Sequence, residues 1–445
     1  MKFGGTSVGD VAAFERVFHI VSTQIERHPV VVVSAMTKVT DALLAAFEMA
    51  KKDDFAGAIV SLEPHFERHA AVSRHFIPAG QPNAFNGELD FARGELADLL
   101  MRVSRRSLPL SMLKDAVVSY GEQLSSRLLA EILKSKGINA RQVDSRRLIV
   151  TDDEYGAAQP IWDETEKLVK LELESLIAAG EVPVMGGFIG ANRGGETTTL
   201  GRGGSDYSAA LIAAALRASE LQIWTDVTGV MTCDPRICGA ARTIPVLSYE
   251  EAAELAYFGA KVLHPKTIKP AVDHSIPVRV CNTFEPNEIG TMVLADSAEA
   301  PNKIKSIAHK KNITTLRITS ARMLGSYGFM SALFQVFERY RTVIDVVSTS
   351  EVSVALTLDN TDSLEQIVTE LSRLGDVEVD PGYAVICVVG EGLRASTGLA
   401  AKVFSTINDV NIALVSHGAS SVNLTFVIKE EFVANVIKRL HEELF

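Results

Sequence analysis

Short apolar runs rich in β-branched residues recur along the first two-thirds of the chain, separated by longer stretches with helical periodicity. Few polar residues interrupt these runs, which is typical of strands that are covered on both faces. The runs are Val30–Val33, Val182–Met185, Leu221–Trp224 and Val278–Cys281. The periodicity predicts helices between them, notably over Asp10–Glu26, Ser119–Lys136 and Tyr207–Ala218. Such alternation predicts an α/β fold with a mostly parallel sheet flanked by helices.

Two segments depart from this alternation. Residues Asp53–Asp115 are rich in helix-forming and charged residues and contain no strand pattern, so we expect a helical excursion that could cover a site. Asp, Ser, Ala, Glu, Pro and Asn cluster over Asp296–Asn302, which indicates a linker.

Beyond this linker the chain repeats itself. The segments Val343–Leu358 and Asn411–Phe426 align without a gap. Each segment is preceded by an earlier strand (Thr314–Ile318 and Ala384–Val389) and a helix, and each is followed by a second helix. The order strand, helix, strand, strand, helix predicts two ferredoxin-like modules. Paired modules at the end of an enzyme favour a regulatory role over mere packing of one repeat against the other.

Composition narrows the class of protein. The chain has 445 residues, of which 47% are apolar, so two or three domains with substantial cores are expected. The net charge of -11 argues against a nucleic-acid partner. Four scattered cysteines do not make a disulfide framework, and the Cys233/Cys238 pair lacks a second pair, so we expect no metal site. No apolar stretch is long enough for a membrane span and no signal-peptide pattern is present, so a cytoplasmic location is expected.

Glycine-bearing turns carry the candidate chemistry. Lys2-Phe3-Gly4-Gly5-Thr6-Ser7 joins a lysine and two hydroxyls to backbone amides that can bind phosphate, although it is not a Walker A loop. Thr197–Asp206 leads into an alanine-rich helix, whose free N–H groups favour an anion. There Arg202 offers a fork for a carboxylate or phosphate, and Asp206 could hold an ammonium or a metal.

Three further charged residues follow strands or begin helices. Asp226 lies just after a predicted strand, where open α/β sheets bind ligands, and Arg236 follows an Asp-Pro turn. Glu122 begins a predicted helix and is as compatible with an ordinary first-turn glutamate as with a functional one. Lys261 could be a surface lysine or a second cation on phosphates.

Together these segments resemble the aspartokinase family. The resemblance is carried, in family order, by KFGGTS at 2–7, VVVSAM at 31–36, GE at 121–122, GGFIG at 186–190, TTTLGRGGSDYSAALIAAAL at 197–216, WTDVTGVMTCDPR at 224–236 and FGAKVLHPKT at 258–267. The tail, through MLGSYGFM at 323–330 and VIDVVSTSEVSVALTLD at 343–359, is similar to the paired ACT modules of the lysine-sensitive branch. The resemblance implies an amino acid kinase domain over 1–295 and ACT modules over 303–380 and 381–445, with strands that could be exchanged between the modules.

It also implies the reaction and its residues. ATP with Mg²⁺ would phosphorylate the side-chain carboxylate of L-aspartate, the first step toward lysine, threonine and methionine, in a homodimer or homotetramer inhibited by L-lysine. Residues implied to bind ATP are Lys2, Gly4, Gly5, Ser7, Thr225, Asp226, Arg236 and Lys261. Residues implied to bind aspartate are Thr6, Ser34, Thr40, Glu122, Phe188, Arg202, Gly203, Ser205 and Asp206. Lys2, Glu122, Arg202 and Asp206 are also implied to be catalytic, and Met323, Ser326, Gly328, Phe329, Met330, Asp345 and Val346 to bind effector.

Two alternatives stay open at this point. The first is another member of the same fold that acts on N-acetylglutamate, glutamate or UMP. The second, from a different class, is a non-catalytic amino-acid sensor with an inactive kinase body. Threonine competes with lysine as the effector.

Overall fold

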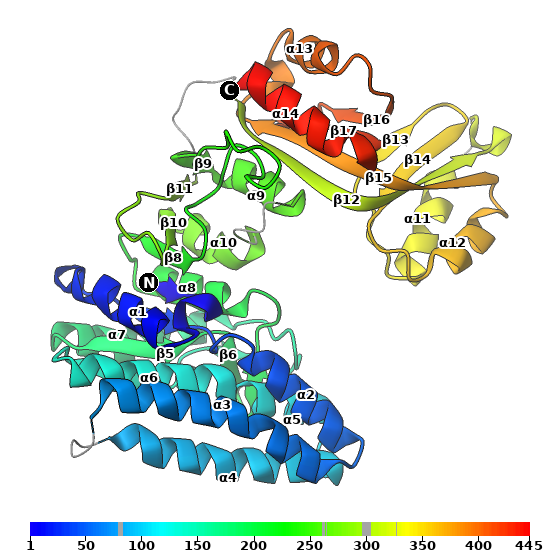
Figure 1. Cartoon of the computed structure of the whole chain (residues 1–445). Coiled ribbons are helices and arrows are strands. Elements are labelled where there is room, and N and C mark those ends of the chain that lie inside the picture. The colour runs from blue at the N-terminus through cyan, green and yellow to red at the C-terminus, as the bar shows by residue number, and fades with distance from the viewer. Residues whose placement is uncertain (79–82, 260–262, 264, 296–303, 326) are drawn as a thin grey trace. The chain divides into compact units, whose positions relative to one another are not determined.

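The computed structural model describes residues 1–78, 83–259, 263, 265–295, 304–325 and 327–445 (Figure 1). The chain divides into two compact units, one formed by residues 1–229 and 264–296 and the other by residues 230–263 and 297–445. Residues 230–263 therefore belong with the C-terminal modules by their contacts, whereas the sequence assigned them to the kinase domain. The predicted linker lies outside the described residues.

The main sheet of the first unit is mostly parallel. Its strands have the order β3-β5-β2-β1-β8-β10-β11, and only β11 is antiparallel to its neighbour β10. The bounds are β1 Lys2–Phe3, β2 Val31–Val33, β3 Ala140–Val143, β5 Val182–Gly186, β8 Leu221–Thr225, β10 Val278–Asn282 and β11 Thr291–Leu294. A small second sheet contains β4 Val150–Thr151, β6 Ile189–Asn192 and β7 Thr197–Thr199. β1 has only two residues but pairs with both β2 and β8, so it lies at the centre of the sheet.

Helices cover this sheet. They are α1 Val11–Ser22, α2 Val39–Lys51, α3 Phe55–Phe76, α4 Ala84–Ser104, α5 Leu110–Val118, α6 Tyr120–Ser135, α7 Trp162–Ala178, α8 Gly204–Ala215 and α10 Pro265–Asp273. Helix α6 packs on the sheet, and α3 and α4 form a further layer outside it (Figure 1). The predicted helical excursion over 53–115 is therefore confirmed. Twelve of the sixteen residues of α6 are buried, because both the sheet and this outer layer cover it.

The second unit is built on one antiparallel sheet of six strands in the order β13-β14-β12-β15-β17-β16. The strands are β12 Ile304–Thr319, β13 Val347–Thr349, β14 Ser353–Leu358, β15 Asp376–Gly390, β16 Ile412–His417 and β17 Asn423–Lys429, and a short strand β9 spans Val246–Ser248. Its helices are α9 Tyr249–Tyr257, α11 Phe329–Arg339, α12 Leu364–Leu371, α13 Leu399–Thr406 and α14 Val433–Leu444. Single 3₁₀ turns complete both units at Gly5–Val8, Ile25–Arg27, Ser145–Arg147, Ala321–Met323, Leu393–Ala395 and Glu430–Phe432.

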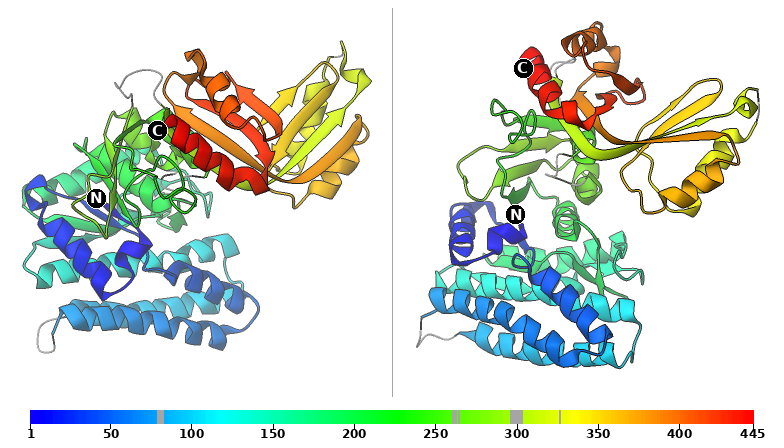
Figure 2. Two further views of the ribbon diagram at one scale, coloured as in Figure 1. Left: turned by 45° about the horizontal axis from the view of Figure 1, so that its top comes forward. Right: turned by 45° about the vertical axis from the view of Figure 1, so that its right-hand side comes forward.

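Two long strands join the predicted modules into this single sheet. The first half of β12 pairs with the second half of β15, and the second half of β12 pairs with β14 and the start of β15. The predicted strands Thr314–Ile318 and Ala384–Val389 are thus only parts of longer strands. Figure 2 shows how β12 and β15 run from one end of this unit to the other.

Among the described residues, no helix is long and apolar enough to cross a membrane.

Candidate active site

A cavity of about 450 Å³ opens in the first unit, beside the carboxyl ends of β1, β2 and β5. Its lining includes nine of the residues implied to bind substrate or ATP: Lys2, Ser34, Thr40, Glu122, Phe188, Arg202, Gly203, Ser205 and Asp206. These residues come from six separate segments of the chain. They meet because the carboxyl ends of adjacent parallel strands lie at one edge of the sheet, where α/β proteins bind ligands.

Lys2 and Asp206 face each other in this cavity. The Lys2 ammonium lies 2.7 Å from Asp206 Oδ1, and both side chains are largely shielded from solvent. Lys2 belongs to β1, whereas Asp206 lies in the first turn of α8, where a negative charge suits the helix dipole. Gly203 precedes that helix with φ 75, a conformation that favours glycine, and a Cβ there would lie 2.7 Å from Thr267.

Glu122 is the most perturbed acid of the cavity. It lies in the first turn of α6 and is 4% exposed. Burial raises the pKa of its carboxyl to about 8, although a hydrogen bond from the backbone of Ala35 and the positive charge of Lys2 oppose this. Its Oε2 has no hydrogen-bond partner among the described residues. A buried acceptor without a partner is costly, so this oxygen is suited to receive a donor from a ligand.

Close backbone packing fixes the position of Glu122. A Cβ on Gly186, at the end of β5, would lie 2.9 Å from both Cβ and the carbonyl oxygen of Glu122. The residue after the next, Phe188, has φ 68, which is strained for a bulky side chain, and its N–H donates to Ser208 Oγ at 2.9 Å. The GGFIG motif thus provides close approach at its first glycine and a strained aromatic residue at the cavity wall.

Asp115 is a lining residue that the sequence analysis missed. It lies in α5, is 2% exposed, and its carboxylate accepts hydrogen bonds from Gly156 N at 2.9 Å, Thr199 N at 2.7 Å and Thr199 Oγ1 at 3.0 Å. Burial raises the pKa of Asp115, and these hydrogen bonds oppose the rise. Asp115 therefore ties the loop at Gly156 and the end of β7 to the helical layer. An acid beside Lys114 in the mostly apolar stretch LSMLKDAVV was the available signal.

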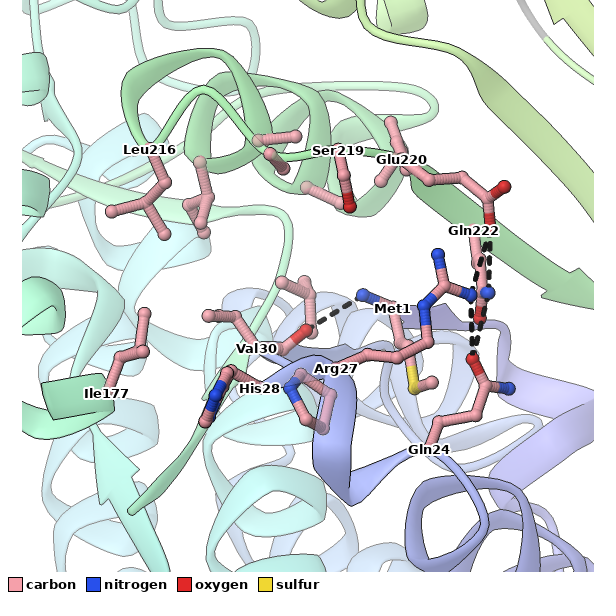
Figure 3. Close-up of a pocket in the computed structure, with 17 residues that line it drawn as sticks. Met1, Gln24, Arg27, His28, Val30, Ile177, Leu216, Ser219, Glu220 and Gln222 are labelled. Atoms are coloured by element: carbon pink, nitrogen blue, oxygen red, sulfur yellow. Dashed lines mark hydrogen bonds and ion pairs between the residues drawn. The ribbon is translucent and has the colours of Figure 1, made fainter. Parts of the chain in front are cut away.

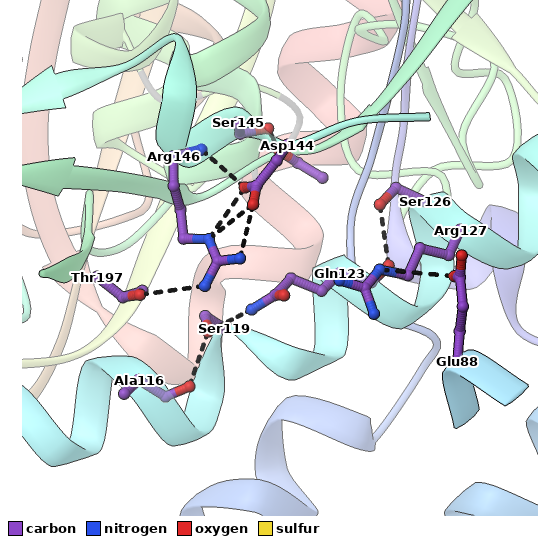
Figure 4. A network of polar contacts seen from close by, with 11 residues as sticks. Glu88, Ala116, Ser119, Gln123, Ser126, Arg127, Asp144, Ser145, Arg146 and Thr197 are labelled. Carbon is purple, nitrogen blue, oxygen red and sulfur yellow. Dashed lines mark hydrogen bonds and ion pairs between the residues drawn. The ribbon is translucent and has the colours of Figure 1, made fainter. Parts of the chain in front are cut away.

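A polar network supports the same helical layer (Figure 4). Arg146 forms a two-pronged contact with Asp144, including 2.6 Å from Nη2 to Oδ2, and its Nη1 lies 3.5 Å from Thr197 Oγ1. Burial raises the pKa of Asp144, but the hydrogen bonds and charge of Arg146 outweigh it and leave the pKa below the ordinary value. Nearby, Gln123 donates to Ser119 Oγ at 2.9 Å across the junction of α5 and α6. The contact between Gln123 and Ser119 lies at the start of α6, next to Glu122.

The KFGGTS turn is only partly available for phosphates. Gly4 N donates to the carbonyl of Trp224 at 3.1 Å, and the buried Ser7 hydroxyl lies 2.7 Å from Thr283 Oγ1. The Gly4 amide and the Ser7 hydroxyl thus join this turn to the ends of β8 and β10, and their contacts with ATP stay predictions. Thr6 is exposed, and Gly5 begins the 3₁₀ turn.

The remaining residues implied to bind ATP are spread over both units. Thr225 ends β8, next to β1 in the sheet, and its hydroxyl lies 3.1 Å from Asp226 Oδ1. Arg236 belongs to the second unit, where its side chain is exposed and pairs with Asp234 at 2.7 Å. Lys261 lies outside the described residues, so its role stays a prediction.

The residues implied to bind effector lie in the second unit. Met323, Phe329 and Met330 are half-buried against the core beneath α11, Gly328 caps that helix with φ 84, and Val346 is buried. Ser326 lies outside the described residues. The Asp345 side chain is only 1% exposed and already has two partners, the Lys310 ammonium at 3.0 Å and the Tyr257 hydroxyl. Lys310, which the sequence analysis missed, also pairs with Asp359 at 2.7 Å.

A second cavity of the first unit, of about 200 Å³, lies at the opposite edge of the sheet (Figure 3). Its walls include Met1, Val30 and Leu221, at the amino ends of the three central strands, and Met1 N donates to Val30 O at 2.8 Å. No residue implied to bind substrate or nucleotide lines it. Ligands of such sheets bind at the carboxyl ends, so the larger cavity is the candidate active site.

Comparison with known proteins agrees with this geometry. The chain matches the amino acid kinase family over residues 1–282 and the ACT domain family over residues 386–444. It is 38% identical, over its whole length and 98% of the relative, to lysine-sensitive aspartokinase 3 of Escherichia coli K12, and 35% identical to chloroplastic aspartokinase 1 of Arabidopsis thaliana, covering all of this chain and 80% of that one.

Solved structures give the same result. The E. coli aspartokinase III complex with aspartate and ADP superposes with a TM-score of 0.82 at 38% identity, covering 100% of this chain and 99% of that one. Aspartate kinase of Clostridium acetobutylicum superposes with a TM-score of 0.86 at 26% identity, with the same coverage. The chain therefore belongs to the aspartokinases of the amino acid kinase family.

Proposed function

We propose that this aspartokinase transfers the γ-phosphoryl group of ATP to the side-chain carboxylate of L-aspartate, giving 4-phospho-L-aspartate and ADP. The supporting observation is the composition of the larger cavity, which places Lys2, Glu122, Arg202 and Asp206 around one space. Cations and acids in one cavity suit a zwitterionic amino acid and a triphosphate. The E. coli relative was crystallised with aspartate and ADP.

Roles follow from the charges. The exposed Arg202 suits the α-carboxylate, since a guanidinium fork matches two oxygens. Glu122 Oε2 and Asp206 suit the α-ammonium, because both are acceptors directed at the cavity. Lys2 suits the phosphates, which would replace Asp206 as the partner of its ammonium. The amide of Gly5 and the amides of Ser205 and Asp206 in the first turn of α8 provide further donors for an anion.

The chemistry requires positioning more than proton transfer. The aspartate side chain is ionised at neutral pH, so it can attack phosphorus without a general base. Two anions must approach each other, which is unfavourable unless cations intervene. We propose Mg²⁺ on ATP together with Lys2 for that purpose, with the rate set by orientation and charge neutralisation. Arg236 and Lys261 remain predictions of the resemblance.

The test is ADP production with a panel of acceptors. L-aspartate is expected to support turnover, whereas L-glutamate, N-acetylglutamate and UMP are not. Loss of turnover in Asp206→Asn, with retention in Asp163→Asn on the exposed start of α7, would locate the activity in the cavity. Absence of ADP production with aspartate would instead favour the non-catalytic sensor.

We further propose feedback inhibition by L-lysine through the ACT modules. The E. coli relative was crystallised with lysine and aspartate in a T-state. In this chain Asp345 is already paired with Lys310, so an incoming lysine ammonium would compete with an internal one of the same chemistry. An effector acts only through a difference in affinity between two states, so it must stabilise the less active state.

Titration of turnover with L-lysine and L-threonine distinguishes the effectors. We expect lysine to inhibit turnover. This inhibition should weaken in Asp345→Asn but not in Asp362→Asn, whose substituted residue lies on the surface of the same module. Unchanged turnover over the lysine titration would reject this regulation. We also propose that the chain assembles into homodimers or homotetramers through the ACT modules. Its reaction would stand at the start of lysine, threonine and methionine synthesis. A cytoplasmic location would suit its four free thiols.

A further inference from the structure

Cys233, Cys238 and His441 form a buried cluster in the second unit, and Arg236, which the resemblance implies in ATP binding, lies in the turn between the two cysteines. One ligand atom from each of the three side chains lies within 4.8 Å of the other two. The exposed fractions are 4% for Cys233, 6% for Cys238 and 3% for His441. The two cysteines are close in sequence, but the histidine comes from α14, about 200 positions further along the chain.

We propose that these three side chains bind one zinc-type divalent ion. Thiolate and imidazole are the ligands that Zn²⁺ prefers in proteins. In a tetrahedral zinc site the ligand atoms lie about 3.8 Å apart, so a contraction of at most about 1 Å would bring this cluster to that geometry. The three side chains leave the fourth position to a water molecule.

The backbone around the cluster is fixed before any ion binds. Cys238 N donates to the carbonyl of Asp234 at 3.0 Å, which closes the turn between the two cysteines. Ile307 N donates to the carbonyl of Thr232 at 2.8 Å, which joins the same segment to β12. A site formed on a fixed turn loses little conformational entropy when the ion binds.

The imidazole is also oriented. Its Nε2 lies 2.9 Å from Thr232 Oγ1, and the ring of Phe445 stacks on it with centroids 4.8 Å apart. Contacts of this kind, outside the ligands themselves, set the orientation of metal-binding histidines.

Charge and surroundings agree with this assignment. Two thiolates and one neutral imidazole cancel the charge of a divalent cation, so the occupied site would be neutral. The cysteines belong to an apolar cluster with Leu393, Val403 and Val436. A neutral site is compatible with such a surrounding, whereas a free thiolate is not. Binding therefore releases both thiol protons, about two per ion.

This proposal departs from the expectation of no metal site that the spacing of the cysteines suggested. A C-x4-C pair without a second pair does not match a zinc motif, and the third ligand is visible only once the chain has folded. The two other cysteines, Cys281 and Cys387, are equally buried, but neither belongs to a group of three potential ligands among the described residues. They provide matched controls.

The first test is elemental analysis of the full-length protein purified without chelators, followed by exchange to Co²⁺. About one zinc per chain is expected. After removal of zinc, Co²⁺ should produce visible d–d bands and a thiolate-to-cobalt charge-transfer band, with release of about two protons per ion. Wild-type protein that holds no zinc and gives no charge-transfer band would overturn the proposal, as would a Cys233–Cys238 disulfide in freshly purified protein.

Variants then locate the ion. Cys233→Ser, Cys238→Ser and His441→Gln should each lose the charge-transfer intensity or reduce the affinity for zinc at least tenfold. Cys281→Ser and Cys387→Ser should retain both. Full zinc retention in the first three variants would place the ion elsewhere and reject the site. If a variant fails to fold, the wild-type cobalt spectrum still decides, because only thiolate ligands produce the charge-transfer band.

Discussion

The ionisation of Glu122 should control how tightly aspartate binds. Its pKa is raised to about 8 by burial, so most ligand-free molecules carry a protonated Glu122 at neutral pH. The proposed partner of this side chain is the α-ammonium of aspartate, which requires the carboxylate form. Binding must therefore remove the proton, and the energy of removal is taken from the affinity.

The magnitude follows from the pKa. At pH 7 about one molecule in ten carries an ionised Glu122, which weakens the apparent affinity for aspartate about tenfold, or about 1.4 kcal/mol. The dissociation constant of aspartate should therefore fall about tenfold per pH unit between pH 6 and 7 and level off above pH 8. Binding at pH 7 should release about 0.9 proton per aspartate by the same ratio.

Isothermal titration calorimetry in two buffers of different ionisation enthalpy measures both quantities. Glu122→Gln should bind aspartate weakly and without this pH dependence. Glu131→Gln, which lies further along α6 and pairs with Lys134, should retain the wild-type profile. A dissociation constant that stays flat from pH 6 to 8, or a Glu122→Gln variant with the wild-type profile, would refute the reasoning.

The same raised pKa has a defined sign for stability. A carboxyl whose pKa is higher in the folded than in the unfolded state contributes stability that is present below the unfolded pKa and lost as pH rises through the folded pKa. For Glu122 the window runs from 4.5 to about 8. Urea unfolding of Glu122→Gln should therefore show a gain over wild type that grows by about 1.4 kcal/mol per pH unit inside this window.

Three further substitutions test the cavity. Lys2→Ala should reduce turnover about 100-fold or more, the scale for losing a charge contact made in the transition state; near-normal turnover would remove Lys2 from the mechanism. Asp115→Asn replaces an oxygen that accepts from two amides with a group that has donors of its own, so urea unfolding should show a loss of about 1–3 kcal/mol; unchanged stability would mean that the Gly156 loop and the end of β7 do not depend on it. Gly186→Ala should displace Glu122, lower the free energy of unfolding by about 1–3 kcal/mol and weaken aspartate binding in calorimetry. Gly94→Ala is the control, because a Cβ there meets no atom within 4 Å.

The alternation of strands and helices was predictable because buried parallel strands and amphipathic helices leave local patterns. Val31–Val33 and Val182–Gly186 were found for that reason. The full lengths of β12 and β15 were not, because the two strands pair with each other across both modules, and pairing over such separations leaves no local pattern. The grouping of residues 230–263 with the C-terminal unit depends on contacts of the same long-range kind.

For the candidate site, the motifs by themselves indicated Lys2, Arg202 and Asp206, whereas Ser34, Thr40 and Phe188 came only from the family resemblance. All six are among the nine implied residues that line the cavity. Asp115 and Lys310 were not predictable, because each is a single charged residue whose partners lie elsewhere in the sequence. The engagement of Gly4 N and of the Ser7 hydroxyl could not be foreseen either, since a glycine-rich turn reveals which donors exist but not which are already used.

The ion pair between Lys2 and Asp206 links the two proposed substrates. In the ligand-free cavity each charge neutralises the other at 2.7 Å. An ammonium arriving at Asp206 leaves Lys2 without its partner, and a phosphate arriving at Lys2 leaves Asp206 without its partner. The cost of separating the pair is thus met only once when both substrates bind, so each should increase the affinity for the other by the same factor. A cavity of this kind favours the complete pair of substrates over either one alone, which limits futile binding of ATP when no acceptor is present.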